Sequence, residues 1–280
     1  SWGIKELDKK TGGIADGPNV VAATPGSGKT SLVITLAIMN CIMRGLPFLF
    51  FSLEMKARDL VKNIISNITE INSRAIREAG VDDDQLLKIK DVRRKLTDLF
   101  QIDETDGITW QQMETKVRLY RKKHKIPIST PILVAIDFIQ KMRSSLDETK
   151  GISQEQQVDI RMNELARIAK QENLKLIEIS QFTRETSKRD NPRPKVTDLK
   201  GSSSIEQNAV IILLMYRPEE HGIYSSPTGI DLKGVCEINI AKSRFSDKEP
   251  VYARFEGKYS KFKDHEMYET GISNNDTEPF

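Results

Sequence analysis

Hydrophobic and polar residues alternate in blocks along this chain. Five short, almost continuous apolar runs are separated by segments in which apolar residues recur at helical spacing; the runs lie at residues 19–24, 47–55, 132–140, 174–181 and 209–217. Uninterrupted apolar runs are typical of strands buried on both faces, as in a parallel sheet covered by helices. The pattern therefore predicts an α/β fold whose mostly parallel, twisted sheet is flanked by helices.

The segments between these runs predict the helices and the sheet edge. Residues 31–44, 57–71 and 83–100 have helical spacing, whereas "VCEINIAKSR" (235–244) and "VYARFEGKYSKF" (251–262) alternate more regularly. Regular alternation predicts a late antiparallel pair at the edge of the sheet.

Three segments fit neither pattern. Residues 142–154 and 183–204 are polar and contain glycine, and we expect both to be long loops, which in a compact domain often have a function. The last ten residues, "GISNNDTEPF", predict a disordered tail at 271–280. The folded domain is therefore expected to span 1–270.

Composition narrows the range of partners. The chain has 280 residues and a net charge of only +3, so any contact with nucleic acid must be local rather than spread over a basic surface. The two cysteines, Cys41 and Cys236, lie far apart and in apolar runs. We expect free buried thiols and a reducing cytoplasm. The apolar run at 33–43 is too short to cross a bilayer, so no membrane partner is expected.

The first apolar run is followed by a glycine-rich turn. The motif is G-x-x-x-x-G-K-[ST], with alanine here at its first position, between a predicted strand and a predicted helix. Backbone amides of such a turn bind phosphates, the lysine reaches the β- and γ-phosphates, and the threonine hydroxyl binds Mg²⁺. The turn thus predicts a site for ATP and Mg²⁺ formed by Ala23, Thr24, Pro25, Gly26, Ser27, Gly28, Lys29, Thr30 and Ser31.

Three further polar residues end apolar runs. The carboxyl ends of parallel strands meet at one edge of the sheet, so we expect Glu54, Asp137 and Gln181 beside the turn. Asp137 would complete the Mg²⁺ site with Thr30, Glu54 would activate water, and Gln181 would contact the γ-phosphate. Alternatively, Asp137 is a buried or capping aspartate, Glu54 caps the helix that starts near Ala57, and Gln181 is an ordinary polar strand end.

With these residues in view, the chain resembles the C-terminal, RecA-like motor domain of DnaB-family replicative DNA helicases. The resemblance covers residues 2 to about 262 and rests on stretches that occur in the family's order: "GIKELDKKTGG", "VVAATPGSGKTS", "FSLEM", "LVAIDFIQ", "ISQFTRE", "DLKGSSSIEQNAVIILLMYR" and "INIAKSR". The family's helical N-terminal domain is expected to be absent from this sequence.

The resemblance implies a role for each matching residue. Lys29 and Glu54 match catalytic residues and Asp137 the Mg²⁺ ligand, while Gln181 matches the sensor of the γ-phosphate. Lys242 and Arg244 match the basic pair that reaches the neighbouring subunit's site, and both are expected on one face of a strand. DNA contacts are expected at Lys200, Gly201, Ser203, Arg189 and Arg193, in a loop directly after Gln181.

We therefore expect an ATP-driven ring motor, hexameric as the resemblance implies, that translocates on single-stranded DNA. A primase or helicase loader is the further partner that the resemblance implies, in the cytoplasm of a bacterium or of a phage's bacterial host. One alternative is a RecA- or RadA-like recombination ATPase, although the sequence contains no recognisable polymerisation motif. Another is a KaiC-like regulatory ATPase, but those have paired glutamates where this chain has one in "SLEM".

Overall fold

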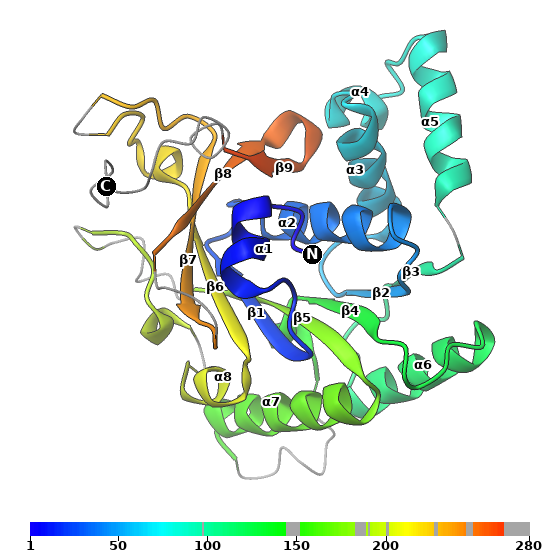
Figure 1. The fold of residues 1–280 in the computed structure, drawn as a ribbon, viewed down its shortest axis with the longest axis vertical. Helices are drawn as coiled ribbons and strands as arrows, with labels where there is room; N and C mark the ends of the chain where they lie inside the picture. The colour runs from blue at the N-terminus through cyan, green and yellow to red at the C-terminus, as the bar shows by residue number, and fades with distance from the viewer. Residues whose placement is uncertain are drawn as a thin grey trace.

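A nine-stranded sheet forms the centre of the protein (Figure 1). The computed structural model describes residues 1–96, 98–143, 152–182, 189, 191–199, 202–226, 229–244 and 249–265. The strand order is β3-β2-β4-β5-β1-β6-β7-β8-β9. The strands are β1 (Gly17–Ala23), β2 (Phe48–Ser52), β3 (Phe100–Asp103), β4 (Ile132–Asp137), β5 (Leu174–Gln181), β6 (Ile211–Tyr216), β7 (Val235–Lys242), β8 (Val251–Glu256) and β9 (Lys261–Asp264).

The sheet has a parallel part and an antiparallel part. Strands β3, β2, β4, β5, β1 and β6 are parallel, and β7, β8 and β9 continue the sheet in antiparallel pairs. The predicted α/β fold and the late antiparallel edge are therefore confirmed. Strand β1 lies between β5 and β6, so the turn that follows it lies near the middle of the sheet.

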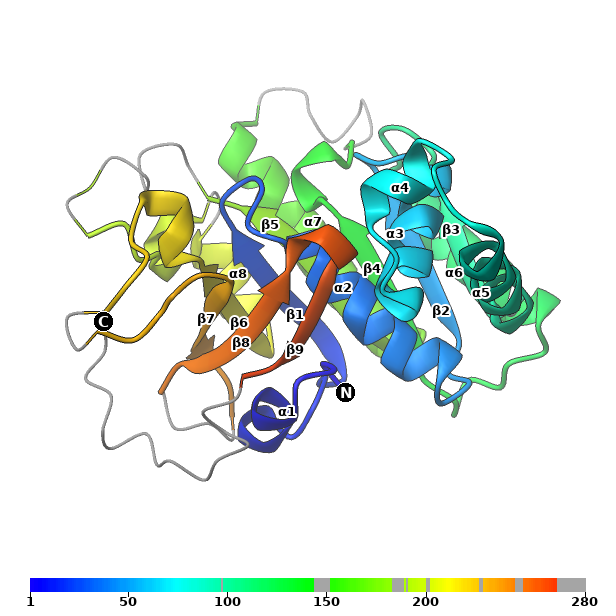
Figure 2. The same ribbon diagram turned by 90° about the horizontal axis from the view of Figure 1, so that it is seen from above.

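Helices cover both faces of the sheet. In Figures 1 and 2, α2 and α3 lie on one face, and α6, α7 and α8 lie on the other. The α-helices are α1 (Lys5–Thr11), α2 (Lys29–Ala37), α3 (Ala57–Thr69), α4 (Ser73–Arg77), α5 (Asp83–Lys95), α6 (Trp110–Lys123), α7 (Gln154–Gln171) and α8 (Ser202–Asn208). A π-helical turn, Ile38–Ile42, continues α2.

The element boundaries differ from the sequence expectation in several places. Strand β4 ends at Asp137 because a 3₁₀ turn, Ile139–Lys141, takes the rest of the apolar run. The helix predicted at 83–100 stops at Lys95, and its last predicted residue instead opens β3, a strand that the pattern does not predict. The segment expected as a loop up to Ser204 already contains the first residues of α8. The 271–280 tail lies outside the described residues.

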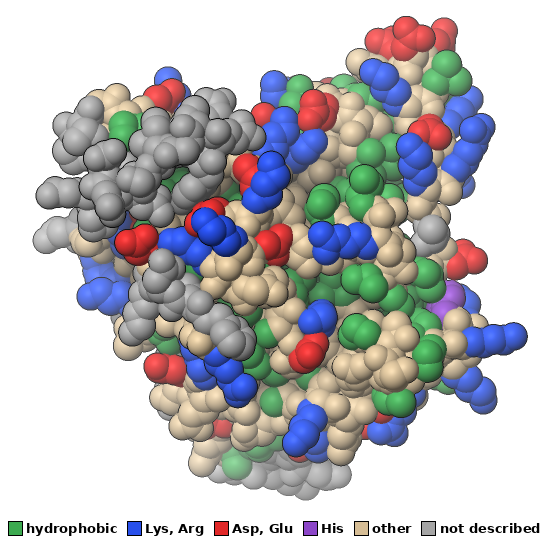
Figure 3. Space-filling model, in the orientation of Figure 1, with side chains coloured by type: hydrophobic (Ala, Val, Ile, Leu, Met, Phe, Trp, Pro, Cys, Tyr) green, Lys and Arg blue, Asp and Glu red, His purple; other side chains and the backbone are tan. Residues whose placement is uncertain are grey.

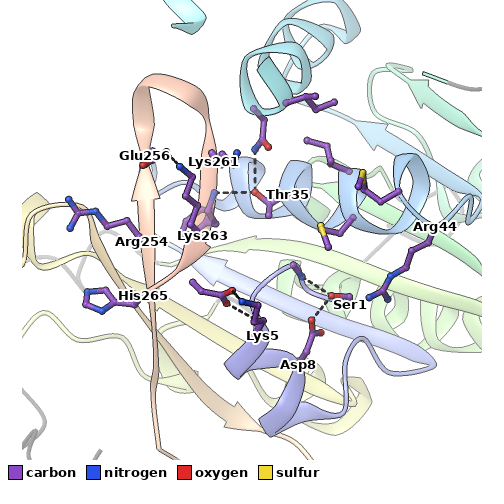
Figure 4. A pocket seen from close by; sticks show the side chains of 18 of the residues that line it. Ser1, Lys5, Asp8, Thr35, Arg44, Arg254, Glu256, Lys261, Lys263 and His265 are labelled. Carbon is purple, nitrogen blue, oxygen red and sulfur yellow. Dashed lines mark hydrogen bonds and ion pairs between the residues drawn. The ribbon is translucent and has the colours of Figure 1, made fainter. Parts of the chain in front are cut away.

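Helix α2, which follows the glycine-rich turn, is hydrogen-bonded to its neighbours β9 and α3. A large cavity of about 1080 Å³ lies between α1, α2 and the β8–β9 hairpin, and Figure 4 shows Thr35 of α2 at its wall. The Thr35 hydroxyl accepts hydrogen bonds from the Phe262 amide at 3.2 Å and from the Asn67 side chain at 3.4 Å. Helix α2 is thereby tied to both β9 and α3.

A carboxyl group without a partner lies in the core. Glu178 of β5 is 1% exposed, and neither carboxyl oxygen has a hydrogen-bond partner among the described residues. Burial raises the pKa of Glu178 to about 8. This side chain therefore carries its proton at neutral pH.

The surface agrees with the small net charge. On the face in Figure 3, Lys and Arg side chains are scattered and interleaved with Asp and Glu. Within the part of the chain that the structure describes, none of the helices has both the length and the apolar character needed to span a membrane.

Candidate phosphate-binding and catalytic site

The glycine-rich turn has the strand and helix that its motif predicts. Strand β1 ends at Ala23 and α2 begins at Lys29, so residues 24–28 form the turn. Gly28 has a φ of +93°, and a Cβ atom there would lie 3.2 Å from the Phe255 ring. Only glycine combines this backbone conformation with such a close approach.

Lys29 lies folded over the turn. Its side chain is buried, and Nζ donates hydrogen bonds to the backbone oxygens of Ala23 at 3.1 Å and Thr24 at 2.9 Å. Burial lowers the pKa of Lys29, while the nearby carboxylates of Asp137, Glu54 and Glu220 act in the opposite direction. Lys29 thus donates to two carbonyl oxygens at the start of the turn and feels the charge of three carboxylates.

Thr30 and Asp137 lie in direct contact. The Thr30 hydroxyl donates a 2.6 Å hydrogen bond to Oδ2 of Asp137, which is 1% exposed. Burial raises the pKa of Asp137, the Thr30 hydrogen bond lowers it, and the charge of Glu54 raises it again. A buried carboxylate in this position is stabilised by a nearby cation.

The oxygen pair fits one kind of metal site. No group of three or more His, Cys, Asp or Glu side chains that could hold a metal occurs in the described part of the chain. Mg²⁺ commonly keeps several waters and takes one or two protein oxygens together with substrate phosphates. Thr30 and Asp137 supply two oxygens of this kind, so the residues present fit Mg²⁺ bound with a nucleotide.

Glu54 lies two residues beyond the end of β2. Ser52 pairs with Asp137 in the sheet, and the Leu53 amide donates to the Asp137 backbone oxygen at 2.8 Å. Glu54 is exposed and lines a cavity of about 380 Å³. It does not cap α3, because the Ala57 amide donates instead to Glu104 at 2.7 Å. The capping alternative for Glu54 therefore has no support in the structure.

Gln181 is the last residue of β5 and pairs with Ala23, the last residue of β1. It therefore lies level with the start of the glycine-rich turn. The carboxyl ends of β1, β2, β4 and β5 lie at the same end of the parallel strands. They bring together, as the sequence predicts, Lys29, Thr30, Glu54, Asp137 and Gln181.

The segment after β6 supplies contacts that the sequence does not indicate. The Ser27 hydroxyl donates to Oε2 of Glu220 at 2.9 Å. Arg217 donates to Oε1 of Glu220 at 2.8 Å and to the Gly26 backbone oxygen at 3.4 Å, and its guanidinium lies 4.4 Å from the Phe255 ring centroid. Residues 27 and 220 are 193 positions apart, and no motif links them.

The basic pair, Lys242 and Arg244, lies away from the carboxyl ends of the parallel strands. Lys242 pairs with Ile212 near the start of β6, and its Nζ donates to the Glu206 backbone oxygen. Arg244 is exposed and lines a cavity of about 360 Å³ that also includes Asp16 and Lys175, next to the first residues of β1 and β5. The structure therefore does not bring Lys242 and Arg244 to the phosphate turn of their own chain.

The residues expected to contact DNA have different settings. Lys200 and Gly201 lie outside the described residues, and Ser203 is exposed on α8. Arg189 forms a 2.6 Å ion pair with Asp198. Arg193 forms a 3.1 Å ion pair with Glu237 and lies 5.1 Å from the centroid of the Tyr216 ring. Carboxylates of the same chain thus already engage both arginines.

The chain matches a known family over almost its whole length. The family model for the DnaB-like helicase C-terminal domain matches residues 1–264. The chain is 31% identical to a probable replicative DNA helicase of Trieres chinensis over 95% of this chain and 57% of that protein. It is 28% identical to the replicative DNA helicase DnaB of Buchnera aphidicola, over 94% of this chain and 55% of the relative. It therefore spans little more than half the length of these relatives.

Solved structures have the same fold. A DnaB-like replicative helicase, studied with its interactions with primase, superposes with a TM-score of 0.84 at 25% identity, over 95% of this chain and 61% of the other. A second solved structure, an ATPase domain, superposes with a TM-score of 0.82 at 24% identity, over 95% and 90% of the two chains. The nine-stranded, mostly parallel sheet is thus a RecA-like ATPase fold.

Proposed function

The chain belongs to the DnaB-like helicase C-terminal domain family, and on that premise we propose that it is the ATP-hydrolysing motor of a replicative DNA helicase. The observation that carries the proposal is the convergence of Lys29, Thr30, Glu54 and Asp137 at the carboxyl edge of the parallel strands. A glycine-rich turn, a lysine and a carboxylate–hydroxyl pair are the groups that phosphoryl transfer from a nucleoside triphosphate requires.

Each residue has a distinct role in the proposed reaction. Lys29 neutralises charge on the β- and γ-phosphates, and the backbone amides of the turn orient them. Thr30 and Asp137 hold Mg²⁺, which supplies charge neutralisation at the phosphates when bound. Glu54, which is exposed and lines a cavity, accepts a proton from the attacking water. Gln181 lies beside the turn, where it contacts the γ-phosphate.

Assembly is the second part of the proposal. Arg244 lines a cavity with Asp16, which precedes β1, and Lys242 pairs with Ile212, level with the middle of β1. Neither side chain lies at the turn of its own chain, and both are therefore proposed to act in the site of a neighbouring subunit. A ring, hexameric as in the family, supplies such a neighbour to every site. Cations delivered in this way make hydrolysis depend on assembly.

The proposed substrate track is single-stranded DNA. The segment after Gln181 directly follows the proposed γ-phosphate contact in sequence, which supports a link between hydrolysis and any DNA contact that this segment makes. Phosphate contacts bind without reading sequence, which suits a motor that moves along any strand. Lys200, Gly201 and Ser203 remain the proposed contacts. Arg189 and Arg193 join them by exchanging their carboxylate partners for DNA phosphates. A primase or loader in the cytoplasm completes the proposed set of partners.

A single assay tests the proposed activity. ATP hydrolysis is measured with and without single-stranded DNA for the wild-type chain and for Lys29→Ala. DNA-stimulated hydrolysis that is lost in Lys29→Ala supports the motor. Hydrolysis that DNA leaves unchanged, in a preparation shown by negative-stain imaging to form rings, contradicts it. Open helical filaments in the same images favour a recombination ATPase instead.

A further inference from the structure

A carboxylate is bound to the phosphate turn itself. Oε2 of Glu220 accepts the hydrogen bond of the Ser27 hydroxyl at 2.9 Å, and Ser27 is 1% exposed. The other carboxylate oxygen, Oε1, would lie 3.9 Å from a Cβ atom built on Gly26. Glu220 therefore contacts the middle of the turn, where a triphosphate brings its own negative charge.

The position of Glu220 is fixed by its own segment. It belongs to the 3₁₀ turn Pro218–His221 that follows β6, and Arg217 donates to it at 2.8 Å. The same Arg217 guanidinium donates to the Gly26 backbone oxygen at 3.4 Å and lies over the Phe255 ring. The carboxylate is thus held against the turn by a neighbouring cation rather than placed there by a freely rotating side chain.

The carboxylate of Glu220 also places a negative charge directly on the phosphate turn. Asp137 and Glu54 have proposed roles with Mg²⁺ and water, but Glu220 has no such role. Its negative charge instead opposes that of the phosphates.

We propose that Glu220 competes with nucleotide phosphate for the Ser27 hydroxyl and so sets the affinity and charge preference of the turn. Nucleotide binding replaces the carboxylate at Ser27, and Arg217 retains the displaced Glu220. The residual repulsion weakens binding of the more highly charged triphosphate more than that of the diphosphate. Glu220 thereby lowers the ratio of the affinity for ATP to the affinity for ADP. This inference rests on the proposed nucleotide-binding function.

The test compares wild type with Glu220→Gln. Glutamine has the same shape, and its carbonyl oxygen still accepts from Ser27, so the variant removes the charge and keeps the contact. We expect about tenfold tighter binding of Mg-ATP by calorimetry, the scale of a partly screened charge pair near a protein surface, and a smaller gain for ADP. Added salt should reduce the gain because it screens the repulsion.

Two variants serve as controls. Glu78→Gln removes an exposed carboxylate at the end of α4 and should leave both affinities unchanged. Glu220→Ala removes the charge together with the hydrogen-bond acceptor and should also tighten ATP binding, provided thermal unfolding shows a folded protein.

Measured affinities for ATP and ADP distinguish a failure of the proposed competition from a failure of the proposed nucleotide-binding function. If wild type binds ATP and Glu220→Gln binds it equally or more weakly, the competition is overturned and the proposed function stands. If neither protein binds ATP, the proposed function is overturned and the inference with it. A gain equal for ATP and ADP overturns the charge preference.

Discussion

Lys242, the last residue of β7, is paired with Ile212, and β6 runs parallel to β1 with Ile212 beside Val20. Arg244, two residues further on, lines a cavity with Asp16, which precedes β1. From there to Ala23 at the end of β1 is roughly 20 Å at the usual rise per strand residue. An arginine side chain cannot span that distance, so Arg244 cannot reach the phosphates bound by its own chain.

The first prediction follows from this separation. Arg244→Ala should bind ATP nearly normally and hydrolyse it on the order of 10³-fold more slowly, the usual scale for cations supplied in trans. Mixed with Lys29→Ala, it should recover part of its turnover, because some sites then combine an intact Lys29 with a neighbour's intact Arg244. ATPase assays of the mixtures measure the recovery.

The mixing experiment has its own control. Mass spectrometry establishes that the oligomers are mixed, and each variant alone gives the background. Mixed oligomers without recovery would show that Arg244 does not act on the neighbouring site.

A second prediction concerns Glu54. Glu54→Gln should keep ATP binding and lower the hydrolysis rate by about two orders of magnitude, the usual scale for losing a general base. Single-turnover hydrolysis measures the rate and calorimetry the binding. Glu104→Gln is the matched control, since Glu104 lines the same cavity and caps α3. If both variants hydrolysed ATP equally slowly, the loss of rate would come from removing a negative charge in the cavity rather than from removing a proton acceptor.

The third prediction concerns pH. Burial raises the pKa of Glu178 from its ordinary value of 4.5 to about 8. Between these values the unfolded chain has released the proton and the folded chain keeps it, so rising pH favours the unfolded state by about 1.4 kcal/mol per unit. Glu178→Gln removes this contribution. The gap, which is the free energy of unfolding of the variant minus that of wild type, should therefore increase as the pH rises from about 5.5 to about 7.5.

Urea unfolding across that pH range measures the gap. Glu206→Gln, an exposed glutamate on α8, serves as the control and should track wild type at every pH. A gap for Glu178→Gln that stays constant with pH would mean that Glu178 is ionised in the folded protein.

The fourth prediction tests the DNA contact at Lys200. Lys200→Ala should weaken binding to single-stranded DNA about equally for all sequences and flatten its salt dependence, because one phosphate contact is lost. Fluorescence anisotropy at several salt concentrations gives the slope. Lys123→Ala, at the end of α6, is a charge-matched control. A slope identical to wild type would place Lys200 away from the DNA.

Much of the fold follows from the pattern of apolar residues. The central parallel strands are buried on both faces and form continuous apolar runs, whereas β3 does not, because its four residues are all only half-buried. The apolar run overestimates the length of β4, since Ile139 is buried in a 3₁₀ turn and extends the run. Apolarity alone does not distinguish a strand from a buried turn.

The positions of the candidate site residues were predictable where a local motif, as at Lys29 and Thr30, or the end of an apolar run marks them. Glu54, Asp137 and Gln181 follow from strand order and the direction of parallel strands. The contact between Ser27 and Glu220 does not, because it depends on where the chain turns after β6. The ion pair of Arg193 with Glu237 joins residues 44 positions apart and equally leaves no periodic signal.

Strand β6 gives the sheet a mechanical property. On one side it is hydrogen-bonded to β1, which leads into the phosphate turn, and on the other to β7, which ends at Lys242, two residues before Arg244. These ladders of hydrogen bonds join the three strands in one continuous part of the sheet, with a register shift between Ile212 and Leu213. A shift of the phosphate turn relative to Lys242 would therefore strain or break sheet hydrogen bonds, which couples these two positions within one chain.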